Sequence, residues 1–170
     1  MPPNDTPPRY CPQRELPPYS YVPGGGWPHP TGHERGHSFG RHESPAAPLD
    51  ETNWRENETW LFAIDLFNHG YYWEAHEAWE ALWHACGRTG PVADLLKGLI
   101  KLAAAGVKSR EGRPQGVKQH AARSLDLLNA AQGLGATPFG LALGDVRSAA
   151  ERIAAESDFQ PPRLTLAIKD

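Results

Sequence analysis

The chain has 170 residues, a formal net charge of −3 and 39% hydrophobic residues, which suits one folded domain of ordinary size. The weak charge argues against a basic nucleic-acid reader, and no apolar run approaches the roughly 20 residues of a membrane span. Cys11 and Cys86 are too far apart to suggest a disulfide framework or zinc knuckle, as in a reducing cytoplasm. The opening Met-Pro-Pro-Asn-Asp lacks a signal peptide's features, so we expect a cytoplasmic protein.

Residues 1–49 are predicted to form a Pro/Gly/His-rich extended arm, partly packed or disordered. Twelve of the 17 prolines and six of the 17 glycines precede Leu49, and proline removes backbone donors and keeps its predecessor extended. Aromatic residues are spread through the segment, which is unusual for a disordered tail. We therefore expect residues 9–40 to pack at least partly on a folded body; the alternative is a docking segment for another protein.

Residues 50–170 are predicted to form an all-α domain, because the apolar spacing becomes helical from Asp50 onward. Asn53 is placed to cap a first helix, with Glu56 completing a capping box, and Gly70 is placed to end it. Four more helices are expected over about Tyr72–Cys86, Pro91–Gly112, Pro114–Gly133 and Leu143–Glu156.

Two further features bear on the packing of this five-helix bundle. Gly98 and Gly106 are costly inside the third helix, which indicates that neighbouring helices approach closely there. The tail alternates apolar residues at Leu164, Leu166 and Ile168, which predicts a short extended strap.

The second helix carries the residues best suited to chemistry. At about 100° per residue, one face holds Tyr72, Ala75, His76, Trp79, Leu82 and Trp83. Glu80 lies at the border of that face, Glu74 points away and Glu77 lies between. We expect His76 to be mostly buried, with Glu80 beside it to accept a hydrogen bond and favour the charged imidazole.

The pair formed by His76 and Glu80 has two interpretations. A histidine on an apolar face is more often a satisfied core residue, so a packed polar pair is favoured. Alternatively, the pair acts as a general base or supplies two metal ligands from one helix face. His120, at the inner edge of the fourth helix, would then complete a three-ligand site, although an edge histidine more commonly reaches solvent.

This helix and the turn before it read Phe67-Asn68-x-Gly70-x-Tyr72-x-Glu74-Ala75-His76-Glu77-x-Trp79-Glu80-x-x-Trp83. The run resembles the hallmark of the domain of unknown function 309 family: a histidine, three residues, a glutamate, two residues, then tryptophan or tyrosine. The resemblance covers about residues 55–130. It implies a compact all-α bundle in a bacterial or archaeal cytosol, draws attention to His76, Glu80 and Trp83, and implies no activity.

Two other clusters are weaker candidates. His29, His33, His37 and His42 lie within 14 residues, but the prolines and glycines among them oppose a helix and a defined metal site. Residues 97–123 contain seven basic residues and one acidic residue. A solvated face that pairs with the acidic helices is favoured there over a phosphate or nucleic-acid contact.

Our first hypothesis is a non-catalytic helical module that binds a protein partner or small ligand, with candidate residues His76, Glu80, Trp83, Glu77, Trp79 and Tyr72. The alternative is a metal-dependent, hydrolase-like enzyme using His76 and Glu80; phosphate or nucleic-acid contact ranks third, and no membrane contact is expected. A divalent metal is not favoured as a cofactor. An enzyme needs at least three ligands around an open position, so a pocket holding His76, Glu80 and further donors would favour the alternative, whereas a His76 sealed under tryptophan with only Glu80 beside it would favour the first hypothesis. The arm over residues 9–40 is expected to cover this face.

Overall fold

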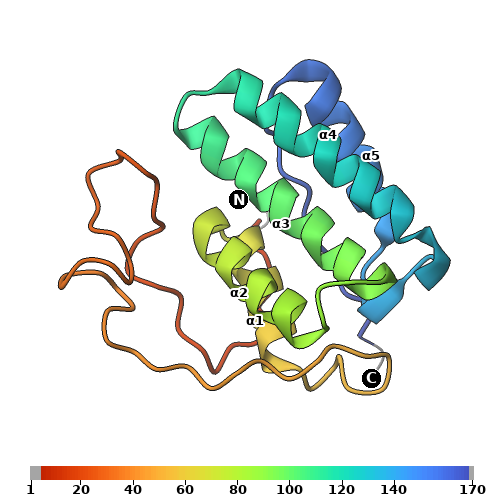
Figure 1. Ribbon diagram of the computed structural model, residues 1–170, viewed down its shortest axis with the longest axis horizontal. Helices are drawn as coiled ribbons and strands as arrows, with labels where there is room; N and C mark the ends of the chain where they lie inside the picture. The colour runs from red at the N-terminus through yellow and green to blue at the C-terminus, as the bar shows by residue number, and fades with distance from the viewer. Residues whose placement is uncertain (1–4, 169–170) are drawn as a thin grey trace.

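The computed structural model describes residues 5–168, and the helices there confirm the prediction of an all-α bundle. The described residues contain one isolated β-bridge, between Leu141 and Leu166. None of their helices is both long and apolar enough to pass through a lipid bilayer. In chain order (Figure 1) the helices are α1 Glu58–Asn68, α2 Tyr72–Ala85, α3 Pro91–Arg110, α4 Pro114–Ala130, the short 3-10 helices η1 Gln132–Leu134 and η2 Pro138–Gly140, and α5 Leu143–Glu156.

Helix α1 begins later than the sequence predicts. Its N-cap is Asn57 and not Asn53, and the Asn57 side-chain oxygen accepts a hydrogen bond from the Trp60 amide at 3.0 Å. Asn53 instead belongs to a turn in which the Asp50 carboxylate accepts from the Asn53 amide at 2.9 Å. Such side-chain turns compete with helix for the same backbone groups, which delays the start of α1.

Successive helices are neighbours in space, so that α3 lies in the middle of the bundle, between α2 and α4 (Figure 1). The predicted close approach at two glycines is confirmed. A Cβ at Gly98 would lie 2.8 Å from the Leu128 side chain, and a Cβ at Gly106 would lie 2.7 Å from the Tyr72 ring. The inner faces form one core, whose largest fully buried side chains include Trp60, Phe67, Trp79 and Phe139.

Residues 5–49 contain no helix or strand and run as an extended arm beside the helical body (Figure 1). Its first anchor is Asp65 of α1, which is fully buried. The Asp65 carboxylate accepts hydrogen bonds from Arg9 Nε at 2.8 Å, the Tyr10 amide at 2.7 Å and the Cys11 amide at 2.8 Å. Backbone donors that an extended segment cannot satisfy within itself thus find an acceptor on the body.

The second anchor of the arm is Glu74 of α2. Its carboxylate accepts from the Ser20 hydroxyl at 2.8 Å and the Tyr21 amide at 3.0 Å, and lies 2.9 Å from His37 Nε2. Glu74 points away from the helical core, as predicted, but the arm buries it, leaving 6% exposed. The arm therefore covers the outer face of α2, and not the face carrying His76 for which we predicted cover.

The C-terminal segment is extended, as predicted, and is attached to the end of α1. Leu164 and Leu166 are buried, whereas Ile168 is exposed. The Asn68 side-chain amide both donates to the Leu164 carbonyl and accepts from the Leu164 amide, each at 2.8 Å. One α1 side chain therefore fixes the position of this strap.

Candidate functional site

The candidate residues of α2 divide between the core and its margin. Tyr72 and Trp79 are buried, Trp79 completely, while Trp83 is half-buried and Glu77 exposed. His76, which we expected to be mostly buried, has 29% of its side chain exposed. It lies at the edge of the buried stripe, so its ring reaches the surface instead of being sealed beneath tryptophan.

A carboxylate lies near each nitrogen of the His76 ring. Nδ1 is 3.2 Å from Glu77 Oε1, and Nε2 is 3.7 Å from Glu80 Oε2. The longer distance is an ion-pair contact and not the hydrogen bond that we predicted. One ligand atom from each residue lies within 4.8 Å of the other two, and within residues 5–168 no other group of three metal-ligating side chains gathers as closely.

The helix register places α3 beside this group. On the α2 side, Tyr72 packs on Gly106, and the Lys97 ammonium lies 4.4 Å from the centroid of the Trp83 ring. Helices α2 and α3 are therefore antiparallel. For any α2 residue between these two contacts, the α3 residue at the same level can be found by interpolation. By this interpolation His76 falls near the level of Ala104 of α3, a residue with a small side chain.

The same reasoning places α4 on the other side of α3. The Ser124 hydroxyl donates to the Gly98 carbonyl at 2.7 Å, and a Cβ at Gly116 would lie 3.0 Å from the Lys108 side chain. These contacts make α4 antiparallel to α3 and set His120 level with position 104, opposite the histidine of α2. Histidines of α2 and α4 thus flank the same small residue of α3.

The pKa of His120 agrees with this placement. Burial lowers it below the ordinary histidine value, and the charges of Lys101, Lys108 and His76 lower it further, against the opposing effect of Glu111. The neutral imidazole is therefore favoured, and it is the form that binds metals. From the sequence, a position near the motif was the less favoured of two possibilities for His120, and it stays a prediction.

Lys101 of α3 completes the face and was not singled out from the sequence. Its pKa is lowered, first by burial, then by the charges of Lys97 and Arg123, while Glu80 acts in the opposite direction. Helical spacing could have revealed it, because Lys97 and Lys101 lie one turn apart on the side of α3 that faces the motif. The site thus includes a lysine as well as imidazoles and carboxylates.

The four arm histidines do not come together as a metal site among the described residues. Only His37 is buried with a partner, the carboxylate of Glu74, and both side chains are about 5% exposed or less. No sequence pattern indicates this pair, because its members are 37 residues apart and belong to segments of different kinds.

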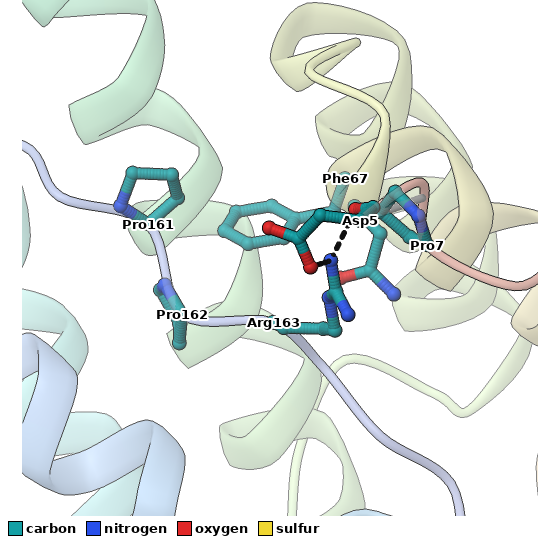
Figure 2. A pocket seen from close by; sticks show the side chains of 7 residues that line it. Asp5, Pro7, Phe67, Pro161, Pro162 and Arg163 are labelled. Carbon is teal, nitrogen blue, oxygen red and sulfur yellow. Dashed lines mark hydrogen bonds and ion pairs between the residues drawn. The ribbon is translucent and has the colours of Figure 1, made fainter. Parts of the chain in front are cut away.

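A cavity of about 500 Å³ lies where the start of the arm meets the C-terminal strap. Figure 2 shows Arg163 reaching across it to Asp5, which it contacts at 2.9 Å. Asn68, also in the lining, uses both ends of its amide on the strap. These polar groups already bind one another. The cavity is therefore part of the contact between the two segments and not a candidate ligand site.

A second cavity, of about 470 Å³, lies between the arm and the outer faces of α1 and α2. Phe62, Leu66 and Trp73 give it an apolar floor, and Glu77 stands in its wall. Glu77 therefore borders both this cavity and the His76 ring. Neither cavity contains His76, Glu80 or His120 in its lining, so the candidate site is an open face.

These features define a class of protein: a helical bundle with an exposed imidazole–carboxylate group on its second helix. Within it, residues 60–119 match the model of the family described as Domain of unknown function (DUF309). The resemblance predicted from the motif is confirmed over that stretch, which includes α2, α3 and the start of α4. No curated protein matches the chain.

Proposed function

We propose that the protein is a non-catalytic helical binding module whose ligand is a divalent transition-metal ion, held on the open face of α2, α3 and α4. The observation that carries the proposal is the gathering of His76, Glu77 and Glu80 ligand atoms within 4.8 Å of one another, at a histidine whose side chain is 29% exposed. Imidazole and carboxylate are the ligands that zinc and similar ions take in proteins. Three of the site residues predicted from the sequence, His76, Glu77 and Glu80, are thus given a common role.

The roles of the individual residues follow from their positions. Glu80 and Glu77 supply oxygen ligands and negative charge, and His76 supplies one ring nitrogen, while a carboxylate lies near the other. His120, favoured in its neutral form, supplies a ligand from α4 once an ion draws the two histidines together. The free thiols of Cys11 and Cys86 fit a reducing cytoplasm, which we propose as the location.

The experiment is equilibrium dialysis of the full chain against Zn²⁺, followed by elemental analysis, for the wild type, His76→Ala and Glu80→Gln. We expect one tightly bound equivalent in the wild type and an affinity at least about tenfold lower in each variant. His84→Ala is the matched control, because His84 is an exposed histidine two turns further along α2. The comparison is of zinc affinity and not of zinc content alone, because we expect the arm histidines to add weak zinc binding.

Two results would contradict the proposal. One is wild-type protein that, dialysed against about a tenfold excess of zinc, retains no more zinc than a chelator-treated blank. That result would mean binding weaker than dialysis resolves. The other is a loss of affinity in His84→Ala equal to that in His76→Ala. Either would leave His76 and Glu80 as a surface ion pair and direct attention to protein partners.

A second candidate is the metal-dependent hydrolase considered from the sequence, and the three ligand atoms that lie within 4.8 Å of one another favour it. Three protein ligands leave a coordination position open for water, which hydrolytic centres require. Zinc-loaded protein should then hydrolyse p-nitrophenyl acetate or p-nitrophenyl phosphate faster than zinc-loaded His76→Ala. Equal rates for the two proteins would exclude these two activities.

A further inference from the structure

Lys101 is a half-buried ammonium that lacks an ion-pair partner. Among residues 5–168, the ion pairs involve other cations, such as Lys108, which lies 2.9 Å from Glu111. Burial also makes the charged form of Lys101 costly. Charges removed from water are normally paired or bound to a ligand, so an anion is the missing element here.

Arg123 of α4 is a second unpaired cation at the same level. The register set by Gly98 and Gly116 puts Arg123 beside Lys101, and the effect of the guanidinium on the lysine agrees. Arg123 is exposed and has no ion pair among the described residues. Lys97, by contrast, lies over the Trp83 ring. Lys101 and Arg123 are thus two neighbouring cations, one on α3 and one on α4, without an ion pair among the described residues.

The open face is therefore divided by charge. The α2 side carries the two carboxylates around His76, which suit a metal cation, and the α3 and α4 side carries the unpaired Lys101 and Arg123, which suit an oxyanion. By the same register, both sides meet near the level of Ala104, a small residue of α3. A ligand there would touch the cation on one side and the ammonium on the other.

We propose that this face binds the phosphate group of a small molecule, held by Lys101 and Arg123 and sharing the metal ion bound through His76 and Glu80. The metal contact rests on the function proposed above; the contacts to Lys101 and Arg123 do not. Two cations match the dianion that phosphate forms at neutral pH. A nucleic-acid chain is disfavoured because the protein as a whole carries a net charge of −3, opposite to a backbone-binding protein.

The test is calorimetric titration of the full chain with inorganic phosphate, first free of metal and then loaded with Mn²⁺. We expect binding in both forms, tighter with Mn²⁺. Lys101→Gln and Arg123→Gln should each weaken metal-free binding about ten- to a hundredfold, as expected for a charge-assisted hydrogen bond. Lys118→Gln is the control, because Lys118 is exposed and, two residues from both Gly116 and His120, lies on the other side of α4.

The outcomes separate this inference from the proposed metal site. His76→Ala should abolish the effect of Mn²⁺ but keep the metal-free binding of phosphate. Absence of phosphate binding in both forms, or equal binding by Lys101→Gln and Lys118→Gln, would overturn the inference and leave metal binding standing. Acetate bound as tightly as phosphate would overturn the choice of a dianion. Phosphate binding without any Mn²⁺ binding would support the roles of Lys101 and Arg123 and overturn the metal proposal.

Discussion

Helix α2 takes part in two histidine–glutamate pairs that differ in almost every physical respect. In the closed pair, His37 of the arm and Glu74 lie 2.9 Å apart and are about 5% exposed or less. In the open pair, His76 and Glu80 lie 3.7 Å apart and are 29% and 37% exposed. The same two residue types therefore attach the arm to α2 in the closed pair and leave ligand atoms free in the open pair.

The difference between the pairs lies in what else uses the carboxylate. Glu74 also accepts hydrogen bonds from Ser20 and Tyr21, so its oxygens are occupied by donors of the arm. Glu80 has no hydrogen bond to another described side chain or backbone group beyond its contact with the imidazole. Burial with full hydrogen bonding indicates a structural role, and exposure with spare bonding capacity indicates a binding role.

The largest effect is expected from removing the carboxylate of the closed pair. Glu74→Ala leaves three arm donors without an acceptor in a buried place, and we expect the free energy of unfolding to fall by about 3–5 kcal/mol. Urea denaturation measures it. Glu151→Ala, at an exposed position of α5, is the control and should change little. Equal stability of the two variants would mean that the closed pair does not hold the arm.

Removing the histidine of the closed pair should cost less. In His37→Ala the Glu74 carboxylate keeps the Ser20 and Tyr21 donors, so we expect a loss of about 1–3 kcal/mol. The arm should also become more sensitive to trypsin. His42→Ala, an exposed arm histidine, should leave the digestion rate unchanged. A loss larger than that of Glu74→Ala would reverse the order that the hydrogen bonds imply.

Neutralising the glutamate of the open pair should cost less still. Glu80→Gln removes an exposed ion pair, and such pairs contribute about 0–1 kcal/mol. The variant should therefore denature at nearly the wild-type urea concentration while losing zinc affinity. A loss of stability beyond about 2 kcal/mol would show that Glu80 supports a buried donor, and the open pair would have to be regarded as structural.

The smallest effect concerns pH and the histidine opposite the open pair. The pKa of His120 lies below its ordinary value of 6.5 because the residue is buried near cations, so the unfolded chain binds the proton more readily than the folded protein. As the pH falls below about 6.5, His120 therefore reduces the free energy of unfolding, until its folded pKa is passed. His120→Gln should flatten this dependence in urea denaturation at about pH 7.5 and about pH 5.5. An unchanged slope would mean that His120 titrates alike in both states.

Local patterns in the sequence were sufficient to predict most of the fold. Apolar spacing with Pro91, Pro114 and the terminal glycines located the helices, because these residues act within one or two turns. The expected α5 agrees with the observed Leu143–Glu156. The start of α1 was wrong because the turn at Asp50 competes with a helix, and propensity at Asn53 does not report that competition.

The candidate site was predicted less completely. The i,i+4 spacing of His76 and Glu80 is local and was visible, but their exposure depends on which side chains α3 presents beside them. Glu74 was correctly directed away from the core, yet its burial depends on the path of an arm that contains no periodic pattern. Contacts between residues far apart in the chain, such as Cys11 with Asp65, have no local signal.

The anchoring of the arm has a consequence for the order in which the chain acquires its structure during synthesis. Arg9, Tyr10 and Cys11 leave the ribosome before their acceptor, Asp65, which lies more than 50 residues later in the chain. The arm therefore has nothing to bind until α1 and α2 have emerged and folded. These arm residues are made before the segment to which they bind, and in the meantime the nascent arm is exposed to proteases and chaperones.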